Sequence, residues 1–184
     1  MRLRFLSRNS HKIREAETIL EPAGVEIVPV NLAIDEIQTA DTRKLVHDKC
    51  LRAFSQIGHP LFVEHTGLYM SSLNGFPGGL TQVFWDTLGA QRFTEIFGRL
   101  LDRKVIAKTI VAYCDGKRVH YFEGAVSGTI AKQPRGNRDF QWDCVFVPDG
   151  YSKTFAELGP VKNSISMRRL ALDCLTSFLR TGSQ

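Results

Sequence analysis

The stretch KVIAKTIVAYCDGKRVHYFEGAVSGTIA, residues 104–131, decides the fold of this chain. Two runs rich in β-branched and aromatic residues lie on either side of Asp115-Gly116. An Asp-Gly pair between two such runs is a strong signal for a tight turn that joins antiparallel strands. The sequence therefore predicts a long β-hairpin, and the other elements are expected to build outward from it.

Strands and amphipathic helices are both predicted around this hairpin. Apolar runs predict strands in residues 2–7, 25–32, 60–79 and 143–150, the second of them weakened by Pro29. Apolar residues at helical spacing predict helices in 12–20, 42–58, 91–101 and 166–180. Hairpin and crossover connections both follow from this order, which predicts an α/β fold with a mixed sheet.

The composition is that of a soluble globular protein. Of the 184 residues, 43% are hydrophobic and 23% are charged, so we expect one domain over residues 1–184 and a cytoplasmic location. No apolar run approaches the roughly 20 residues that a membrane span needs. Residues 1–6 are too short for a signal peptide. The four cysteines are scattered along the chain, so we expect reduced thiols and no structural zinc.

The charge balance favours an anionic ligand. A formal net charge of +5 suits either a nucleotide or a nucleic acid. Because the basic residues are spread along the chain without a long Lys/Arg tract, a nucleic acid is the weaker expectation.

The polar segment Ser7–Lys12 lies between a predicted strand and the start of a predicted helix. Free backbone N–H groups and the helix dipole make such a place suitable for an anion, and Lys12 adds a positive charge for a phosphate. Taken alone, the segment is better explained by an ordinary helix cap at Asn9 or Ser10 with a solvated lysine.

A second polar cluster, FQWD at residues 140–143, precedes a short predicted strand. Its two aromatic rings stand beside a carboxylate, which suits stacking on a planar base while the acid reads the edge of that base. It is equally well explained if Phe140 and Trp142 are core residues and Asp143 is a cap.

A third polar cluster lies in GPVKNSISMRRLAL, residues 159–172, at the start of the last predicted helix. Its members are Lys162, Ser166 and Arg168. On their own they are explained by a helix start in which Ser166 is the N-cap.

Taken together, these segments resemble the inosine triphosphate pyrophosphatase (ITPase) family. The resemblance spans nearly the whole chain and rests on SRNSHK, IDEIQ, VEHTGL, LNGFPGG, GAVSGTI, PRG, DFQWDCVFVPDGYSKTFAEL and VKNSISMRRLALDCL. It implies an elongated mixed sheet flanked by helices, with two lobes around a central nucleotide cleft, and a homodimer. It also implies cleavage of deaminated purine triphosphates (ITP, dITP and XTP) to the monophosphate and pyrophosphate with Mg²⁺.

The resemblance assigns roles to individual residues. Asn9 and Lys12 match the triphosphate-binding loop of the family, and Glu36 matches a metal-binding glutamate. The residues that match its base and ribose site are Phe140, which stacks on the base, Trp142, Asp143, Lys162, Ser166 and Arg168. A guanidinium only donates, so Arg168 is expected to pair with the O6 acceptor of a 6-oxopurine and to reject the amine of adenine.

The sequence departs from the family pattern at two positions. His65 stands where the pattern acid-Asp-Ser/Thr-Gly-Leu has an aspartate that helps to bind metal and activate water. Met167 replaces the histidine of a Ser-His-Arg motif. Imidazole is a poor substitute for the oxygen ligands of Mg²⁺, so metal binding and hydrolysis are expected to be impaired. Glu64 is not expected to replace the aspartate, because adjacent strand residues point to opposite faces.

Several functions stay open at this point. The favoured hypothesis is a nucleotide sensor that holds dITP or ITP and signals through an effector protein, for example in a bacterial stress or anti-phage response. The second is a working pyrophosphatase that uses His65 as its base, with Mg²⁺ or an imidazole-tolerant metal such as Mn²⁺. A cationic His65 that contacts phosphate would instead strengthen binding. A structural subunit with a vestigial cleft is third, and a nucleic-acid binder is a distant fourth.

Overall fold

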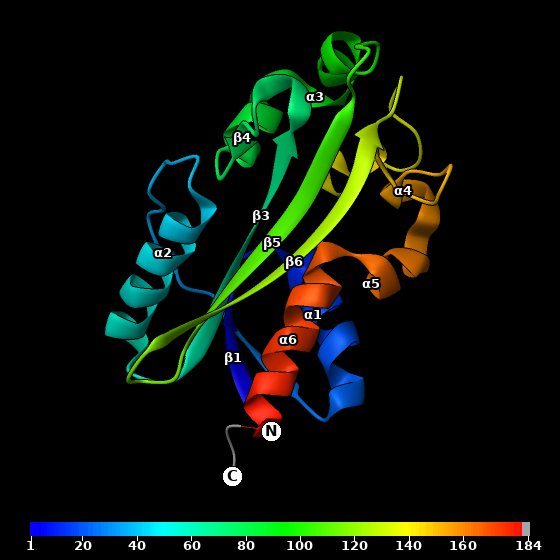
Figure 1. The fold of residues 1–184 in the computed structure, drawn as a ribbon. Coiled ribbons are helices and arrows are strands. Elements are labelled where there is room, and N and C mark those ends of the chain that lie inside the picture. The colour runs from blue at the N-terminus through cyan, green and yellow to red at the C-terminus, as the bar shows by residue number, and fades with distance from the viewer. Residues whose placement is uncertain (182–184) are drawn as a thin grey trace.

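A computed structural model describes residues 1–181, which form one long twisted sheet flanked by helices (Figure 1). The strands run in the order β2 (Glu26–Val30), β1 (Arg2–Leu6), β3 (Leu61–Met70), β5 (Lys104–Cys114), β6 (Val119–Ile130) and β7 (Phe146–Pro148), and β4 (Pro77–Gly78) pairs with β3. β1 pairs in parallel with β2 and β3, and the other pairs are antiparallel. The prediction of a mixed sheet in an α/β fold is therefore confirmed.

The hairpin predicted around Asp115-Gly116 is present at the centre of the sheet. β5 and β6 pair from Lys104 opposite Thr129 down to Cys114 opposite Val119. The Asp115 carboxylate accepts hydrogen bonds from the backbone N–H groups of the two residues that follow Gly116, at 2.7 and 2.8 Å. Gly116 has a φ of 101°, a backbone conformation that favours glycine. Local turn chemistry thus closes the hairpin as the sequence predicts.

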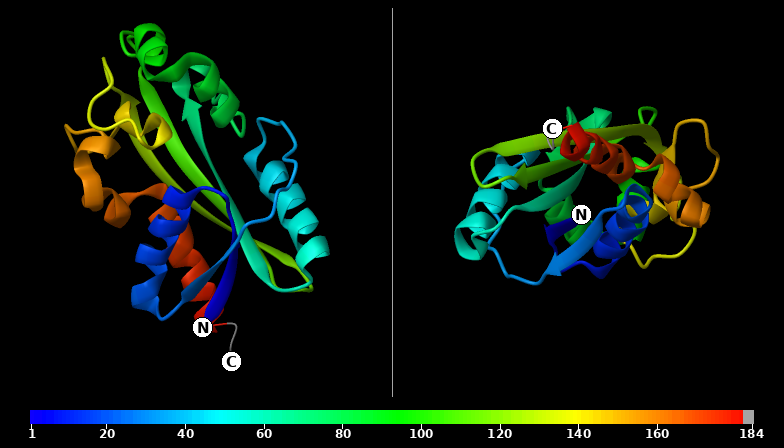
Figure 2. Two further views of the ribbon diagram at one scale, coloured as in Figure 1. Left: turned by 180° about the vertical axis from the view of Figure 1, so that it is seen from behind. Right: turned by 90° about the horizontal axis from the view of Figure 1, so that it is seen from below.

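Helices cover both faces of one half of the sheet, which Figure 2 shows from behind and from below. α1 (Ser10–Leu20) and α6 (Met167–Thr181) pack on the face that carries Phe62 and Val111. α2 (Thr42–Ile57) packs on the opposite face, which carries Leu61 and Ala112. Neighbouring strand residues serve different cores because successive side chains point to opposite faces. These three helices confirm the predictions for 12–20, 42–58 and 166–180.

The other half of the sheet carries its own core. α3 (Thr81–Phe97), the 3₁₀ turn η3 (Gln141–Cys144) and α4 (Phe155–Leu158) pack against strand residues such as Leu68 and Val105. Helices therefore gather at two ends of the sheet, as the two-lobed arrangement requires (Figure 1). The remaining short elements are η1 (Glu21–Ala23), η2 (Ser71–Leu73), η4 (Gly159–Val161) and α5 (Lys162–Ile165).

One predicted helix has wrong boundaries. The sequence predicts it in 91–101, but α3 begins at Thr81 and ends at Phe97. Two helical segments meet at Gly89, whose φ of 64° and ψ of 172° are not helical. Because glycine interrupts the apolar pattern there, the first segment is not recognisable as part of the same helix. Within residues 1–181, none of the helices combines the length and apolar character that a membrane crossing requires.

Candidate functional site

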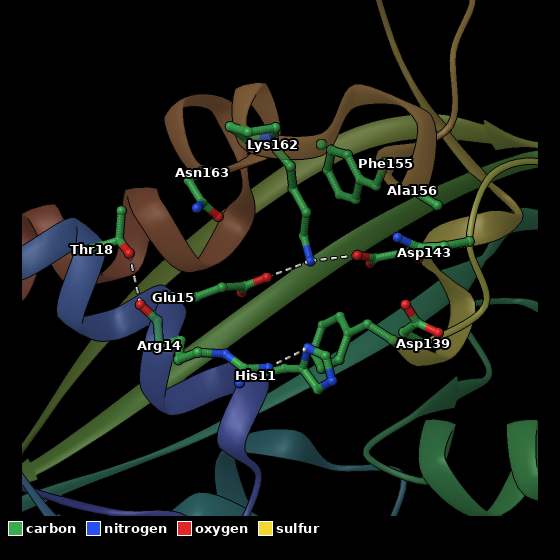
Figure 3. A pocket seen from close by; sticks show the side chains of 14 residues that line it. His11, Arg14, Glu15, Thr18, Asp139, Asp143, Phe155, Ala156, Lys162 and Asn163 are labelled. Atoms are coloured by element: carbon green, nitrogen blue, oxygen red, sulfur yellow. Dashed lines mark hydrogen bonds and ion pairs between the residues drawn. The ribbon is translucent and has the colours of Figure 1, made fainter.

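Two cavities open along the first turns of α1. One, which we call the aromatic pocket, has a volume of about 330 Å³ and lies between α1 and the segments 137–143 and 155–163 (Figure 3). The other, which we call the charged pocket, has a volume of about 280 Å³ and lies between the start of α1, β3 and the segment 32–36. Seven of the ten predicted site residues line them: Phe140, Asp143 and Lys162 in the first, and Asn9, Lys12, Glu36 and His65 in the second.

A buried lysine organises the aromatic pocket. The Nζ atom of Lys162 lies 2.5 Å from Asp143 Oδ2 and 2.7 Å from Glu15 Oε1, as Figure 3 shows. The same Nζ atom lies 4.3 Å from the centroid of the Phe140 ring. Burial raises the pKa of Asp143. Within residues 1–181, the second oxygen of Asp143, Oδ1, is buried and has no hydrogen-bond partner, so it is an unsatisfied acceptor beside the pocket.

Alternating charges connect the aromatic pocket to the charged pocket. Beyond Lys162, Glu15 also pairs with the guanidinium of Arg168. Arg168 Nε in turn donates to Glu64 Oε2 at 3.1 Å, and Glu64 Oε1 lies 2.7 Å from Lys12 Nζ. Burial alone would raise the pKa of Glu64, but Arg168 and Lys12 hold it well below its usual range. The Glu64 carboxylate is therefore ionised at neutral pH, and the two pockets share one network.

Three predicted site residues lie beneath the pockets and line neither of them. The guanidinium of Arg168 donates to the carboxylates of Glu64 and Glu15 and to the Thr66 hydroxyl, so four of its five N–H donors are already used inside the protein. Trp142 is 2% exposed and packs against Phe146, which makes it a core residue. The Ser166 hydroxyl accepts from the N–H of Arg169 in the first turn of α6, as expected for a cap. Arg168 is a buried counter-ion that pairs with Glu64 together with Lys12, and with Glu15 together with Lys162.

The start of α1 has the helix cap considered for it, and Lys12 in its first turn lines the charged pocket. Asn9 is the N-cap, and its Oδ1 atom accepts from the backbone N–H groups of His11 and Lys12 at 3.0 and 3.1 Å. The side chain of Lys12 continues into the charged pocket. The loop therefore has an ordinary cap and also places a cation beside the cavity.

His65 and Glu64 both line the charged pocket, contrary to the expectation that only one of them would. β1 pairs with β3 only at Leu61 and Phe62, and β4 pairs with β3 only at Leu68 and Tyr69, so the edge of β3 between Phe62 and Leu68 is open on this side. Side chains from both faces of the strand can reach a cavity that wraps around an open edge. His65 Nδ1 lies 4.0 Å from Glu36 Oε2, and within the described chain His65 Nε2 has no hydrogen-bond partner.

His65 is uncharged at neutral pH. Burial lowers its pKa to about 4, and Lys12 adds to this effect against the attraction of Glu36 and Glu64. An uncharged imidazole offers no positive charge to a phosphate, and a pKa this low makes it a weak base. The surroundings of His65 therefore favour neither of the two active roles considered for it from the sequence.

The charged pocket does not fit a Mg²⁺ ion held by the protein alone. Among residues 1–181, no group of three or more His, Cys, Asp or Glu side chains converges on one point. The Glu36 carboxylate is paired with Lys49 at 2.6 Å, and Glu64 is already engaged by two cations. Mg²⁺ prefers several free oxygen ligands at short distances, which this arrangement does not supply.

Sequence reasoning missed two members of this site, Glu15 and Lys49. It also missed the ion-pairing role of Glu64. Glu15 follows Lys12 at helical spacing, so a shared face could have been predicted from the pattern. Lys49 lies on an amphipathic helix with many solvated charges, and no local signal distinguishes it from them.

The buried imidazole predicts a pH dependence of stability. Because the pKa of His65 is about 4 in the folded chain and about 6.5 when unfolded, the unfolded chain binds more protons between these values. Stability contributed by His65 is therefore complete above the unfolded pKa and falls as the pH drops toward 4. Between about pH 7 and about pH 5, the free energy of unfolding measured with urea should fall by about 2 kcal/mol because of His65.

Substitution isolates the contribution of His65. His65→Asn should remove most of this pH dependence, whereas His59→Asn, at an exposed position, should leave it unchanged. Equal slopes of stability against pH in His65→Asn and the unmodified chain would contradict the assignment of the effect to His65.

Comparisons with known proteins agree with this architecture. The model of the Ham1 family matches residues 3–178. A dITP/XTP pyrophosphatase from Thermococcus kodakarensis is 37% identical over 182 residues, which cover 98% of each chain. An inosine triphosphate pyrophosphatase from Yarrowia lipolytica is 36% identical over 178 residues, 95% of this chain and 94% of that protein. A HAM1 protein structure from Coxiella burnetii shares the fold with a TM-score of 0.82 at 24% identity, covering 98% of this chain and 99% of that one.

Proposed function

Because the chain belongs to the Ham1 family, we propose that it binds deaminated purine nucleoside triphosphates, dITP and ITP and also XTP. The observation that carries the proposal is the network of alternating charges that joins an aromatic pocket to a pocket lined by cations. A purine ring suits the aromatic pocket beside Phe140, and a triphosphate suits the charged pocket beside Lys12. Relatives named dITP/XTP pyrophosphatase support this ligand class.

Lys162 and Asp143 are the groups that we expect to read the base, in the place first given to Arg168. A 6-oxopurine presents an acceptor at O6 next to a donor at N1, whereas adenine presents a donor next to an acceptor. The Lys162 ammonium only donates, and the free Oδ1 atom of Asp143 accepts. This pair matches the oxopurine edge, whereas adenine would oppose its amine donor to the Lys162 ammonium and its N1 acceptor to the Asp143 carboxylate, which is a heavy penalty.

We propose further that hydrolysis is slow and that the chain acts as a nucleotide sensor. His65 is neutral and supplies no carboxylate, and the carboxylates of Glu36 and Glu64 are already neutralised by cations. Any Mg²⁺ would depend on the phosphates of the ligand for most of its oxygen ligands, because Glu36 and Glu64 are already paired with cations. Three further features stay predictions from the sequence: an effector protein that receives the signal, a homodimer and a cytoplasmic location.

The alternative is an active pyrophosphatase that releases the monophosphate and pyrophosphate. The activity in the names of the relatives favours it. Turnover distinguishes the two functions, because both require the same ligand.

Binding and turnover should be measured on one purified sample. A moderate excess of dITP over its Kd should stabilise the fold by about 1–3 kcal/mol, whereas dATP at the same concentration should stabilise it far less. Pyrophosphate release should stay well below about 1 s⁻¹ in the presence of Mg²⁺ or Mn²⁺. Turnover at or above that rate would support the pyrophosphatase, and no stabilisation by dITP would indicate a vestigial cleft.

A further inference from the structure

Two glutamine side chains from distant segments meet at the charged pocket. Gln82 lies in the first turn of α3 and Gln141 lies in η3, 59 residues later in the chain, and both line this pocket. The Nε2 atom of Gln141 donates to Oε1 of Gln82. Gln82 Nε2 in turn donates to Asp86 Oδ1 at 2.7 Å. The amide pair therefore connects α3 to the segment that carries Phe140 and Asp143.

The backbone of Gln141 is held in an unfavourable conformation. Its φ is 41°, and within residues 1–181 only Asn74 shares a positive φ among residues other than glycine. Asparagine tolerates this region well, whereas glutamine is seldom found there. Such conformations persist where the surroundings determine them, often at functional sites. The result here is that Phe140 lines the aromatic pocket while its neighbour Gln141 lines the charged one.

The pair leaves hydrogen-bond donors at the rim of the charged pocket. A primary amide carries two N–H donors, and in the described chain each of these amides uses one. Lys12 and Lys49 already pair with carboxylates, whereas Arg8 pairs with no carboxylate of residues 1–181. The uncommitted donors that line this cavity therefore include Arg8 and the two amides, which suit phosphate oxygens.

We propose that Gln82 and Gln141 form an amide clamp that binds the β- and γ-phosphates of the nucleotide. The inference rests on the proposed function. Neither glutamine lines the aromatic pocket, so the clamp contacts only the part of the ligand that extends beyond the base. It makes the affinity depend on the number of phosphates, and it links the phosphates to the segment that holds the base.

Two substitutions remove the clamp without disturbing the base site. Gln141→Gly deletes one amide at a backbone position that glycine prefers, so the fold is expected to be retained. Gln82→Ala deletes the other amide. The matched control is Gln91→Ala, because Gln91 also lies on α3 and donates to an acid four residues later, Glu95, at 3.2 Å. Gln91 lines neither pocket.

Calorimetric titration with dITP and with dIMP tests the clamp. Each clamp variant should bind dITP about 10-fold or more weakly, as expected for the loss of a hydrogen bond to an ionised group. The change for dIMP should stay below about 3-fold, and Gln91→Ala should match the unmodified chain for both ligands. Thermal unfolding of each variant checks that the fold is intact.

The possible failures are distinguishable. If the unmodified chain binds dITP and both clamp variants bind it equally tightly, the clamp is wrong and the proposed function stands. An equal loss for dITP and dIMP would also overturn the clamp, because it would show that the glutamines act at the base. Absence of dITP binding by the unmodified chain would overturn the proposed function and the clamp with it.

Discussion

Replacing His65 by aspartate is expected to raise the rate of pyrophosphate release from dITP by about 100-fold or more in the presence of Mg²⁺. His65 lines the charged pocket, and its Nδ1 atom lies 4.0 Å from Glu36 Oε2. A carboxylate at this position would add the oxygen donors and the negative charge that a neutral imidazole lacks. Steady-state release of pyrophosphate from dITP, with and without Mg²⁺, measures the gain.

His65→Asn is the matched control, since asparagine has the size of aspartate and carries no charge. It should hydrolyse dITP as slowly as the unmodified chain. A second readout is the thermal shift caused by Mg²⁺ together with dITP, which should be larger for His65→Asp than for His65→Asn. If the two variants release pyrophosphate equally slowly, the loss of activity does not originate at His65.

The predictable parts of the fold are those that local chemistry determines. The Asp115-Gly116 turn and the apolar periodicity of α1, α2 and α6 are visible in short stretches of sequence, and the structure confirms them. α3 is not visible in this way, because Gly89 interrupts its pattern and tertiary packing joins its two segments. The same distinction applies to the site.

Motif matches locate residues of the site but do not determine their partners. The sequence places Lys12, Phe140 and Lys162 at element ends, and the structure brings them to the two pockets. Arg168 was expected to face the base, yet it pairs with Glu15 and Glu64, which are 153 and 104 residues away in the chain. Contacts at such separations depend on how the helices pack on the sheet, which no local pattern encodes. The neutral state of His65 likewise follows from burial, which the sequence does not show.

Replacing Arg168 by alanine is expected to lower the free energy of unfolding by about 3–5 kcal/mol. Arg168 is 1% exposed and donates to Glu64, which is buried, and to Glu15, which is partly buried at the aromatic pocket. Without the guanidinium, each carboxylate loses one of its two cations, and Glu64 keeps Lys12 while Glu15 keeps Lys162. Arg169→Ala is the control in the neighbouring position. Arg169 pairs with Asp173 at 2.7 Å on the surface of α6, so its loss should cost only about 0.3–0.5 kcal/mol.

The pH dependence of this loss of unfolding free energy distinguishes the effect of a buried charge from the effect of lost side-chain packing. In the unmodified chain Arg168 and Lys12 hold the pKa of Glu64 below its usual range, so the stability they contribute is present at neutral pH and is lost in acid. In Arg168→Ala, Lys12 remains beside Glu64, but burial is expected to raise the pKa of Glu64 above that of the unmodified chain, so protonation would relieve a charge that is only partly compensated. The difference in unfolding free energy between the unmodified chain and Arg168→Ala, measured with urea, should therefore shrink as the pH is lowered from about 7 to about 4. A deficit that stays constant over this range would indicate that Arg168 contributes through packing of its side chain alone.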